Sequence, residues 1–293
     1  MGKKARLIGG ALLAIVVIVL AVAYFRQHPV AVLDPKGVIA DKEFRLMVTA
    51  AILSAVVIIP VFVLTFTVAW KYRASNKRAK HAPDWDHNTA LELTWWGIPC
   101  AIILVLAVLA WTSSHQLDPY RKLSATTKPL AVQVVALQWK WLFIYPAQHV
   151  ATVNFLPIPV GTPIDFSITS DAPMNSFWIP QLGGQVYAMS GMQTQLHLMA
   201  DRPGTYYGAS ANISGAGFAS MNFTADAMTQ TDFARWVSYA RQAKQHLTQD
   251  SYAQLAKPSQ NTPLGAYVAD DDNLYGTILM KYMPAMDMGE MSH

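Results

Sequence analysis

The chain has 293 residues, of which 53% are apolar and only 14% are charged, and its formal net charge is +4. This composition is apolar for a soluble protein, and long apolar runs account for it, which favours a membrane protein. Residues 1–111 carry 12 Lys and Arg against 6 Asp and Glu, whereas residues 112–293 carry 10 against 12, so the basic patch of a nucleic-acid-binding domain is not expected.

The first apolar run extends from Leu7 to Phe25 and follows a cluster of basic residues at positions 3, 4 and 6. A basic start followed by an apolar core is typical of a signal peptide, and Ala21-Val22-Ala23 could serve as its cleavage site. The run is nevertheless long enough to span a bilayer. Residues 1–27 are therefore expected to form a signal sequence or an uncleaved anchor helix, and we slightly favour the anchor.

Two further apolar runs, Leu46–Trp70 and Leu93–Trp111, predict a transmembrane helical hairpin within residues 28–112. The connection at residues 71–80 holds five basic residues, which places it in the cytoplasm by the positive-inside rule and the large C-terminal part outside. Thr89-Ala90-Leu91-Glu92 predicts a capping box at the start of the second hairpin helix. Aromatic residues near the helix ends are expected at the membrane interface, namely Trp70, Tyr72, Trp95, Trp96 and Trp111.

From Lys128 the pattern changes to short runs rich in Val, Ile, Thr and aromatic residues, separated by turn residues, which predicts an antiparallel β-sandwich or barrel. Alternation in the run Gln193–Leu198 places Leu196 inside and His197 outside, so we interpret His197 as a solvated strand residue rather than a ligand. The expected strands are Leu130–Leu137, Trp141–Tyr145, Ala151–Phe155, Pro163–Thr169, Gln193–Met199, Gly204–Ala209 and Phe218–Ala225.

Residues 229–293 are expected to form C-terminal helices followed by a Met-rich tail. A helical period begins near Thr231, a shorter helix is expected at Ser251–Lys257, and Asn261–Asp272 is expected to be a loop. Thioethers outside the membrane could bind Cu(I) weakly, but a flexible tail with partner contacts is the favoured interpretation. The tail contains Met280, Met283, Met286, Met288, Met291 and His293.

Two segments within the strand region, Met174–Pro180 and Gly208–Met221, have a distinctive spacing. They resemble the copper-binding segments of subunit II of the haem-copper respiratory oxidases. That family places a His before an S-F/W-x-x-P run, and later the run G-Q-C-S-E-x-C-G-x-x-H-x-x-M. The frame is present here, but the resemblance implies that Asn175 and Phe218 replace the two His, Ser210 and Ser214 the two Cys, and Asn212 the Glu, while Met221 is retained.

The chemistry of these replacements argues against copper. A binuclear thiolate-bridged site needs two thiolates and two imidazoles, because soft sulfur and imidazole ligands hold copper. The serine hydroxyl is neutral and hard, one thioether is too weak alone, and the single cysteine, Cys100, lies in an apolar run. No metal site is therefore expected in this chain, and the resemblance points to the quinol-oxidase branch of the family, of the cytochrome bo type.

The resemblance implies an α+β membrane protein with a transmembrane helical hairpin, a periplasmic cupredoxin-like Greek-key barrel at residues 113–228 and a C-terminal helical extension. It also implies a multi-pass protein of the bacterial inner membrane that scaffolds haem-copper oxidase subunit I. Further small membrane subunits are expected as additional partners. Haem and copper are expected in subunit I, none is expected here, and ubiquinol is the expected substrate of the complex. Neither a catalytic residue in this chain nor a cytochrome c partner is expected.

Glu92 begins Glu92–Pro99, which resembles the family motif E-x-x-W-T-x-x-P, whose Glu lies near the mouth of a proton pathway in subunit I. Glu92 is therefore a proton-entry candidate, although a helix cap alone accounts for a Glu at this position. Trp139 and Trp141 match an aromatic strand that serves electron entry in cytochrome c oxidases. We interpret them as packing residues, because no copper acceptor lies below them.

Two alternatives remain open at this stage. One is a cytochrome c oxidase subunit II, against which the lost ligands and the small negative charge of residues 112–293 argue, since a cytochrome c donor is usually steered by a strongly acidic face. The other is a non-oxidase membrane scaffold that kept a cupredoxin without copper. The Glu92–Pro99 motif and the helical hairpin argue against that alternative.

Overall fold

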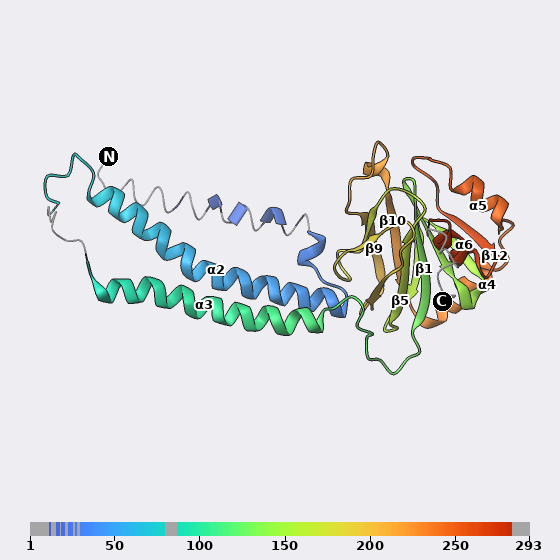
Figure 1. Ribbon diagram of the computed structural model, residues 1–293, viewed down its shortest axis with the longest axis horizontal. Coiled ribbons are helices and arrows are strands. Elements are labelled where there is room, and N and C mark those ends of the chain that lie inside the picture. Colours follow the sequence, from blue (N-terminus) through green and yellow to red (C-terminus); the bar gives the residue numbers. More distant parts are fainter. Residues whose placement is uncertain are drawn as a thin grey trace, which may run out of the picture. The chain divides into compact units, whose positions relative to one another are not determined.

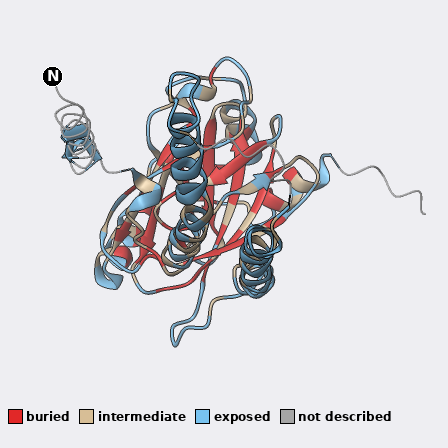
Figure 2. Cartoon of the chain, turned by 90° about the vertical axis from the view of Figure 1, so that its left-hand side faces the viewer, coloured by how far each residue is buried: buried red, intermediate tan, exposed pale blue. Residues whose placement is uncertain are grey.

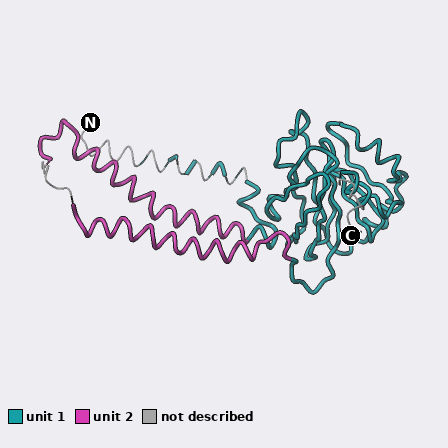
Figure 3. The backbone as a smooth tube through the Cα atoms, viewed as in Figure 1, with its two compact units in different colours: residues 1–41, 122–293 teal, residues 42–121 magenta. Residues whose placement is uncertain are grey.

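We describe a computed structural model of the chain, which covers residues 30–79 and 87–282 together with scattered residues between 12 and 27. The chain divides into two units, residues 42–121 and a second unit of residues 1–41 and 122–293 (Figure 3). Most of the 1–27 segment and all of the tail beyond Tyr282 lie outside the described residues, so the expectations for the leader and for the Met-rich tail remain predictions. The same holds for the expected domain boundaries.

The hairpin unit consists of two long helices, α2 (Val38–Lys71) and α3 (Thr89–Gln116). At 1.5 Å per residue they are about 51 Å and 42 Å long, which exceeds the roughly 30 Å apolar core of a bilayer. Both are long and apolar enough to cross a membrane. Most of their residues are exposed (Figure 2). The expected interface aromatics are exposed as well, including Tyr72, which follows the end of α2. The prediction of two long apolar helices is confirmed.

The predicted capping box at the start of α3 is wrong. The N-cap is Asn88, whose side-chain oxygen accepts from the Leu91 N–H at 3.0 Å, and Thr89 is already the first helical residue. Asn is a strong N-cap because its short side chain reaches the N–H groups that the first turn leaves unpaired. This leaves the Glu92 side chain available for another partner.

The larger unit contains two sheets, visible as the strand-rich part of Figure 1. One has seven strands in the order β11-β12-β3-β2-β1-β5-β8, and the other has five in the order β4-β10-β9-β6-β7. The strands are β1 (Leu130–Leu137), β2 (Lys140–Tyr145), β3 (Val150–Val153), β4 (Phe155–Pro159), β5 (Ile164–Ser170), β6 (Asn175–Trp178), β7 (Val186–Ala188), β8 (Thr194–Leu198), β9 (Gly204–Ser210), β10 (Asn222–Met228), β11 (His246–Leu247) and β12 (Gly265–Ala269).

The sheets are mixed rather than purely antiparallel as predicted, because β1 pairs with β5, β4 with β10 and β11 with β12 in parallel. The remaining helices of this unit are short. They are the 3₁₀ turns η1 (Ala31–Leu33), η2 (Pro146–Gln148) and η3 (Phe218–Ser220), and the helices α4 (Gln230–Ala240), α5 (Gln249–Leu255) and α6 (Leu274–Met280). The predicted order of helical hairpin, β-barrel and C-terminal helices is thus confirmed.

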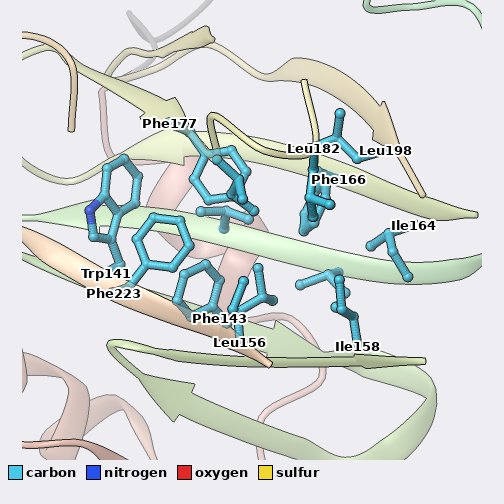
Figure 4. Packing of buried hydrophobic residues seen from close by; sticks show 14 of the residues in the cluster. Trp141, Phe143, Leu156, Ile158, Ile164, Phe166, Phe177, Leu182, Leu198 and Phe223 are labelled. Carbon is cyan, nitrogen blue, oxygen red and sulfur yellow. The ribbon is translucent and has the colours of Figure 1, made fainter. Parts of the chain in front are cut away.

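The main core lies between the inner faces of the two sheets (Figure 4). Alternate residues of each strand point into it, as the period of two requires. The rings of Phe177 and Phe223 stack with centroids 5.2 Å apart, and Trp141 meets both rings edge to face. Trp141 is fully buried, so its large apolar ring surface is removed from water, which stabilises the core. The interpretation of Trp141 as a packing residue fits this position.

A second apolar cluster covers the outer face of the seven-stranded sheet. It is formed by the C-terminal arm, which we define as residues 241–282, packed on Leu137, Leu142 and Ile144. The arm also extends the sheet, because β12 pairs with β3 and β11 with β12. The expected loop at Asn261–Asp272 is therefore wrong: it contains a strand that forms only through this long-range pairing.

Candidate functional site

The copper-ligand positions of the family frame are brought together by two strands and one loop. Asn175 begins β6 and Ser210 ends β9, and these strands pair antiparallel with Phe177 opposite Ser210. The loop from residue 211 to 221 then returns the chain to β10. The loop is closed at its base by a backbone hydrogen bond of 3.2 Å from the Ser210 N–H to the Met221 carbonyl.

Ser210 is the centre of a hydrogen-bonded network. Its hydroxyl donates to Asn175 Oδ1 at 2.9 Å and also lies 3.2 Å from the Asn212 carbonyl. It accepts from the backbone N–H groups of Ser176 and Asn212 at 3.4 Å. Asn175 and Ser210 are both buried, so their polar atoms need partners within the protein. The network supplies these partners and joins β6 to the loop.

The side chains of Asn175 and Asn212 are fixed at their other ends as well. Asn175 Nδ2 donates to the Pro173 carbonyl at 2.7 Å, and Asn212 Nδ2 donates to the Met174 carbonyl at 3.2 Å. Both asparagines therefore hold the segment before β6 against the loop. A metal ion is not required to connect these two parts of the site.

The three remaining positions are less tightly connected. Met221 is buried, and its Sδ lies 4.0 Å from the Ser214 hydroxyl, which donates to it. Phe218 begins η3 and is half-buried, with its N–H bonded to the Gly215 carbonyl at 3.1 Å. The structure thus brings all six positions together at one loop, with the Met221 N–H donating to the Phe218 carbonyl at 3.0 Å.

Trp139 closes the loop from the other sheet. Its indole Nε1 donates to the Ser214 carbonyl at 3.2 Å, and its ring lies directly against Gly217. A Cβ atom at Gly217 would approach the ring to 2.3 Å, so only glycine fits here. Trp139 therefore anchors the loop, in agreement with its interpretation as a packing residue.

The residues present do not fit a thiolate-bridged copper centre. The donor set consists of neutral amides, hydroxyls and one thioether, whereas such a centre needs thiolates and imidazoles. The amide and hydroxyl groups of Asn175 and Ser210 are also already engaged with each other. Among the residues that the structure describes, no three or more His, Cys, Asp or Glu come together as a metal-binding group.

Glu92 lies in the hairpin unit, in the first turn of α3. Its carboxylate is 2.7 Å from His87 Nδ1, just outside the helix. The structure therefore gives Glu92 a titratable neighbour that the sequence motif did not suggest. Glu92 was interpreted either as a proton-entry candidate or as a helix cap. A position in the first turn of α3 is compatible with both interpretations.

The prediction that His197 is solvated is wrong. His197 is only 5% exposed, and its Nδ1 lies 2.7 Å from Asp165 Oδ1 on the neighbouring strand β5. The two residues are directly opposite in the β5–β8 pairing. Alternation placed His197 correctly on the face opposite Leu196, but that face is covered rather than open to water.

The sequence did not single out Asp171, which holds the C-terminal arm. Its side chain is 1% exposed and accepts from Lys281 Nζ at 2.7 Å, from the Tyr252 hydroxyl at 2.6 Å and from the Tyr282 hydroxyl. Burial acts to raise the pKa of Asp171, but the hydrogen bonds from Lys281 and the two tyrosines outweigh it and hold the pKa below its ordinary value. Asp171 also lies four residues before Asn175, so the arm is fastened close to the site.

Lys140 is a second buried contact to the arm. It is 2% exposed, and its Nζ donates to the carbonyls of Leu255 and Lys257 at 2.7 and 2.8 Å, at the end of α5. Burial lowers the pKa of Lys140. A lysine within an apolar strand, between Trp139 and Trp141, was the available sequence signal for such a buried donor.

Comparison with known proteins identifies relatives along most of the chain. Residues 146–228 match the family model described as cytochrome c oxidase subunit II, periplasmic domain, and residues 241–286 match the COX aromatic-rich motif. The chain is 49% identical over 261 residues to cytochrome bo(3) ubiquinol oxidase subunit 2 of Pseudomonas putida, covering 89% of this chain and 83% of that protein. It is also 49% identical over 259 residues to ubiquinol oxidase subunit 2 of Acetobacter aceti, covering 88% and 84% respectively.

Among solved structures, the periplasmic domain of subunit II of cytochrome oxidase from Bradyrhizobium japonicum is similar to this chain at 21% identity. The match covers 41% of this chain and 96% of that structure, with a TM-score of 0.38.

Proposed function

Because the chain belongs to the subunit 2 family of the ubiquinol oxidases, whose periplasmic domain is cupredoxin-like, we propose that it acts in such a complex as a subunit without a redox cofactor of its own. The complex oxidises ubiquinol, reduces oxygen to water and pumps protons. Haem and copper reside in subunit I. This chain scaffolds subunit I and caps its outer face.

The observation that carries this proposal is the bond between Ser210 and Asn175. In a copper-bearing relative these positions would present a thiolate and an imidazole to metal. Here they satisfy each other, which supports a subunit that is not part of the electron path. Quinol delivers its electrons from within the bilayer, so a water-exposed copper relay is dispensable and a cytochrome c partner is not needed.

Two features of the chain support a scaffold role: the two long helices and the loop of residues 211–221. The two long helices offer mostly exposed apolar side chains, which suit contact with another membrane subunit and with lipid. The loop of residues 211–221 is fastened to the barrel by Trp139, whose indole donates to the Ser214 carbonyl. In this proposal that fastened loop forms part of the face that covers subunit I.

The proposed location is a bacterial inner membrane, crossed more than once, with the barrel in the periplasm. The basic connection between α2 and α3 supports a cytoplasmic position for that end of the hairpin. Glu92, which lies in the first turn of α3 at the same end, is then placed at the cytoplasmic side. We retain it as a proton-entry candidate, with His87 at 2.7 Å as the group that could exchange a proton with it.

The proposal is tested by purifying the affinity-tagged full chain from bacterial membranes in a mild detergent. We expect a haem-bearing subunit to co-purify, and we expect the preparation to consume oxygen with ubiquinol but not with reduced cytochrome c. Copper and haem analysis should assign all metal to the partner. Oxidation of cytochrome c, or purification without any haem, would overturn the proposal.

A further inference from the structure

The connection that follows α2 carries four basic side chains within eight described residues, and we refer to residues 70–78 as the basic turn. All four are exposed, and none forms an ion pair with any residue that the structure describes. Asp84 and Asp86 follow outside the described residues, and the next acidic residue, Glu92, already pairs with His87. The basic residues are Lys71, Arg73, Lys77 and Arg78.

The basic turn is folded around the side chain and backbone of Asn76. Asn76 Nδ2 donates to the carbonyl of Lys71, the last residue of α2. Its Oδ1 accepts from the Arg78 N–H at 3.3 Å, and its own N–H donates to the Arg73 carbonyl at 2.9 Å. These bonds gather the basic residues into a compact turn at the end of the helix.

Arg73 is oriented by the aromatic residue that ends the apolar run of α2. Its guanidinium lies over the Trp70 ring, with Cζ 4.8 Å from the ring centroid. Its Nε donates to Ser75 Oγ at 2.9 Å, and its Nη1 donates to the Trp70 carbonyl at 3.5 Å. A guanidinium has more N–H donors than these two bonds use, so the remaining donors can bind an acceptor outside the protein.

The position of the basic turn along α2 matches the headgroup region of a bilayer. The apolar run Leu46–Trp70 ends directly before the first cation. Trp70 is 67% exposed and Tyr72 is 53% exposed, as is typical of aromatic residues at the level of the headgroups. The cations therefore begin where a bilayer changes from acyl chains to headgroups.

Two simpler roles account for part of this charge. The helix dipole favours a cation in the last turn of α2, which explains Lys71. The positive-inside rule favours basic residues anywhere in a cytoplasmic connection. Neither role requires an arginine stacked on an indole, or a turn that gathers Arg73 and Arg78 around Asn76.

We propose that the basic turn binds the phosphate of anionic phospholipid headgroups. A guanidinium matches the oxygens of a phosphate bidentately, and a lysine adds a compact positive charge. Clusters of about four or more basic residues directly after a membrane helix are attracted to anionic lipid. The exposed aromatic side chains favour lipid over an acidic protein surface, because they suit headgroup depth. The inference rests on the proposed position of the hairpin in a membrane and not on quinol oxidation.

The test is native mass spectrometry of the full-length chain in detergent, titrated separately with phosphatidylglycerol, phosphatidylcholine and inorganic phosphate. Wild type should prefer phosphatidylglycerol over phosphatidylcholine and should not bind inorganic phosphate at matched concentration. The double variant Lys77→Gln/Arg78→Gln should bind phosphatidylglycerol about thirtyfold more weakly, since each basic residue near an anionic surface contributes about fivefold. Far-ultraviolet circular dichroism should show the same helix content in all variants.

Two further variants separate the basic turn from net charge. The control Lys128→Gln/Lys244→Gln removes the same charge from exposed positions of the other unit and should leave binding within about twofold of wild type. Arg73→Lys keeps the charge but loses the planar group that stacks on Trp70 and binds phosphate bidentately. It should weaken phosphatidylglycerol binding about threefold.

Each alternative has its own signature. Tight binding of inorganic phosphate would assign the basic turn to a free anion. Equal loss in the control variant, or unchanged binding in Arg73→Lys, would reduce the effect to general charge. Unchanged lipid binding in Lys77→Gln/Arg78→Gln, with loss of partner subunits from the purified complex, would assign the cations to a protein interface. Any of these outcomes overturns the lipid site, whereas ubiquinol oxidation reports separately on the proposed function.

Discussion

The Ser210 hydroxyl donates a 2.9 Å hydrogen bond to the side-chain oxygen of Asn175, across the junction of β9 and β6. Both residues are buried, and both occupy positions at which copper-bearing relatives place ligands. The bond therefore does structurally what a shared metal ion would do, because it connects the segment before β6 to the loop after β9. It does so without any group that could accept an electron.

Removing this connection should destabilise the domain. Ser210→Ala leaves Asn175 Oδ1 and two backbone N–H groups without their partner, and an unsatisfied buried polar group costs about 1–3 kcal/mol. We expect a lower midpoint of thermal unfolding for the full chain in detergent. Ser238→Ala, which removes a hydroxyl from the exposed face of α4, should leave the midpoint nearly unchanged. Equal midpoints for the two variants would contradict the structural role of the Ser210 network.

The contact between Gly217 and Trp139 predicts a coupled pair of substitutions. Gly217→Ala places a methyl group 2.3 Å from ring atoms of Trp139, and overpacking of this kind costs about 1–3 kcal/mol. In a Trp139→Leu background the clash is removed, so the same substitution should cost much less. A double-mutant cycle of unfolding free energies measures this difference. Additive costs would show that the loop does not depend on Trp139.

Asp171 predicts an acid-sensitive C-terminal arm. The folded-state pKa of its carboxyl lies below the ordinary value, so its bonds to Lys281 and the tyrosines stabilise the arm fully above that value. This stability is lost as the pH falls below about 3.9 and through the folded-state pKa. We expect limited proteolysis within residues 257–264 to accelerate in that range, and Asp171→Asn to accelerate it already at pH 7. Asp232→Asn, at a half-exposed position of α4, is the matched control and should behave as wild type.

Glu92 predicts a functional effect that a helix cap would not produce. Because Asn88 already caps α3, Glu92→Gln should leave the stability of the hairpin nearly unchanged. If Glu92 assists proton entry, the same variant should lower ubiquinol oxidase turnover several-fold and shift its pH dependence. His87→Gln should produce a weaker change in the same direction. The hypothesis fails if Glu92→Gln leaves both turnover and its pH profile unchanged.

Local patterns predicted much of the fold. The hairpin followed from two apolar runs, and the expected strand at Leu130–Leu137 agrees with β1 residue for residue because a short Val-rich apolar run reads as a strand. The resemblance to the family motif singled out two segments that are far apart in the sequence, and the structure brings these segments together through the β6–β9 pair. The hairpin helices and β1 depend on residues that are close in sequence. The two motif segments lie on β6 and from the end of β9 onward, and these strands pair directly.

Features that depend on distant partners were missed. The short strand β12 exists because it pairs with β3, more than a hundred residues earlier, and α6 is held by packing on the outer face of the sheet. His197 was assigned to the correct face, but burial depends on what covers that face. The unbroken apolar run Trp141–Tyr145 could have indicated that the outer face of the seven-stranded sheet is covered. A strand that is apolar on both faces is covered on both faces.

The most direct test of the account is the copper content and near-infrared absorption of the purified full-length chain after incubation with excess copper. A variant carrying Asn175→His, Ser210→Cys, Asn212→Glu, Ser214→Cys and Phe218→His is the positive control, because it returns the family ligands to the retained frame. Weak Cu(I) binding by the Met-rich tail would not absorb in the near infrared, so it cannot imitate the signal. We predict no near-infrared band for the natural chain and a binuclear band for the variant. A band and two coppers per natural chain would contradict the account and return cytochrome c as the electron donor.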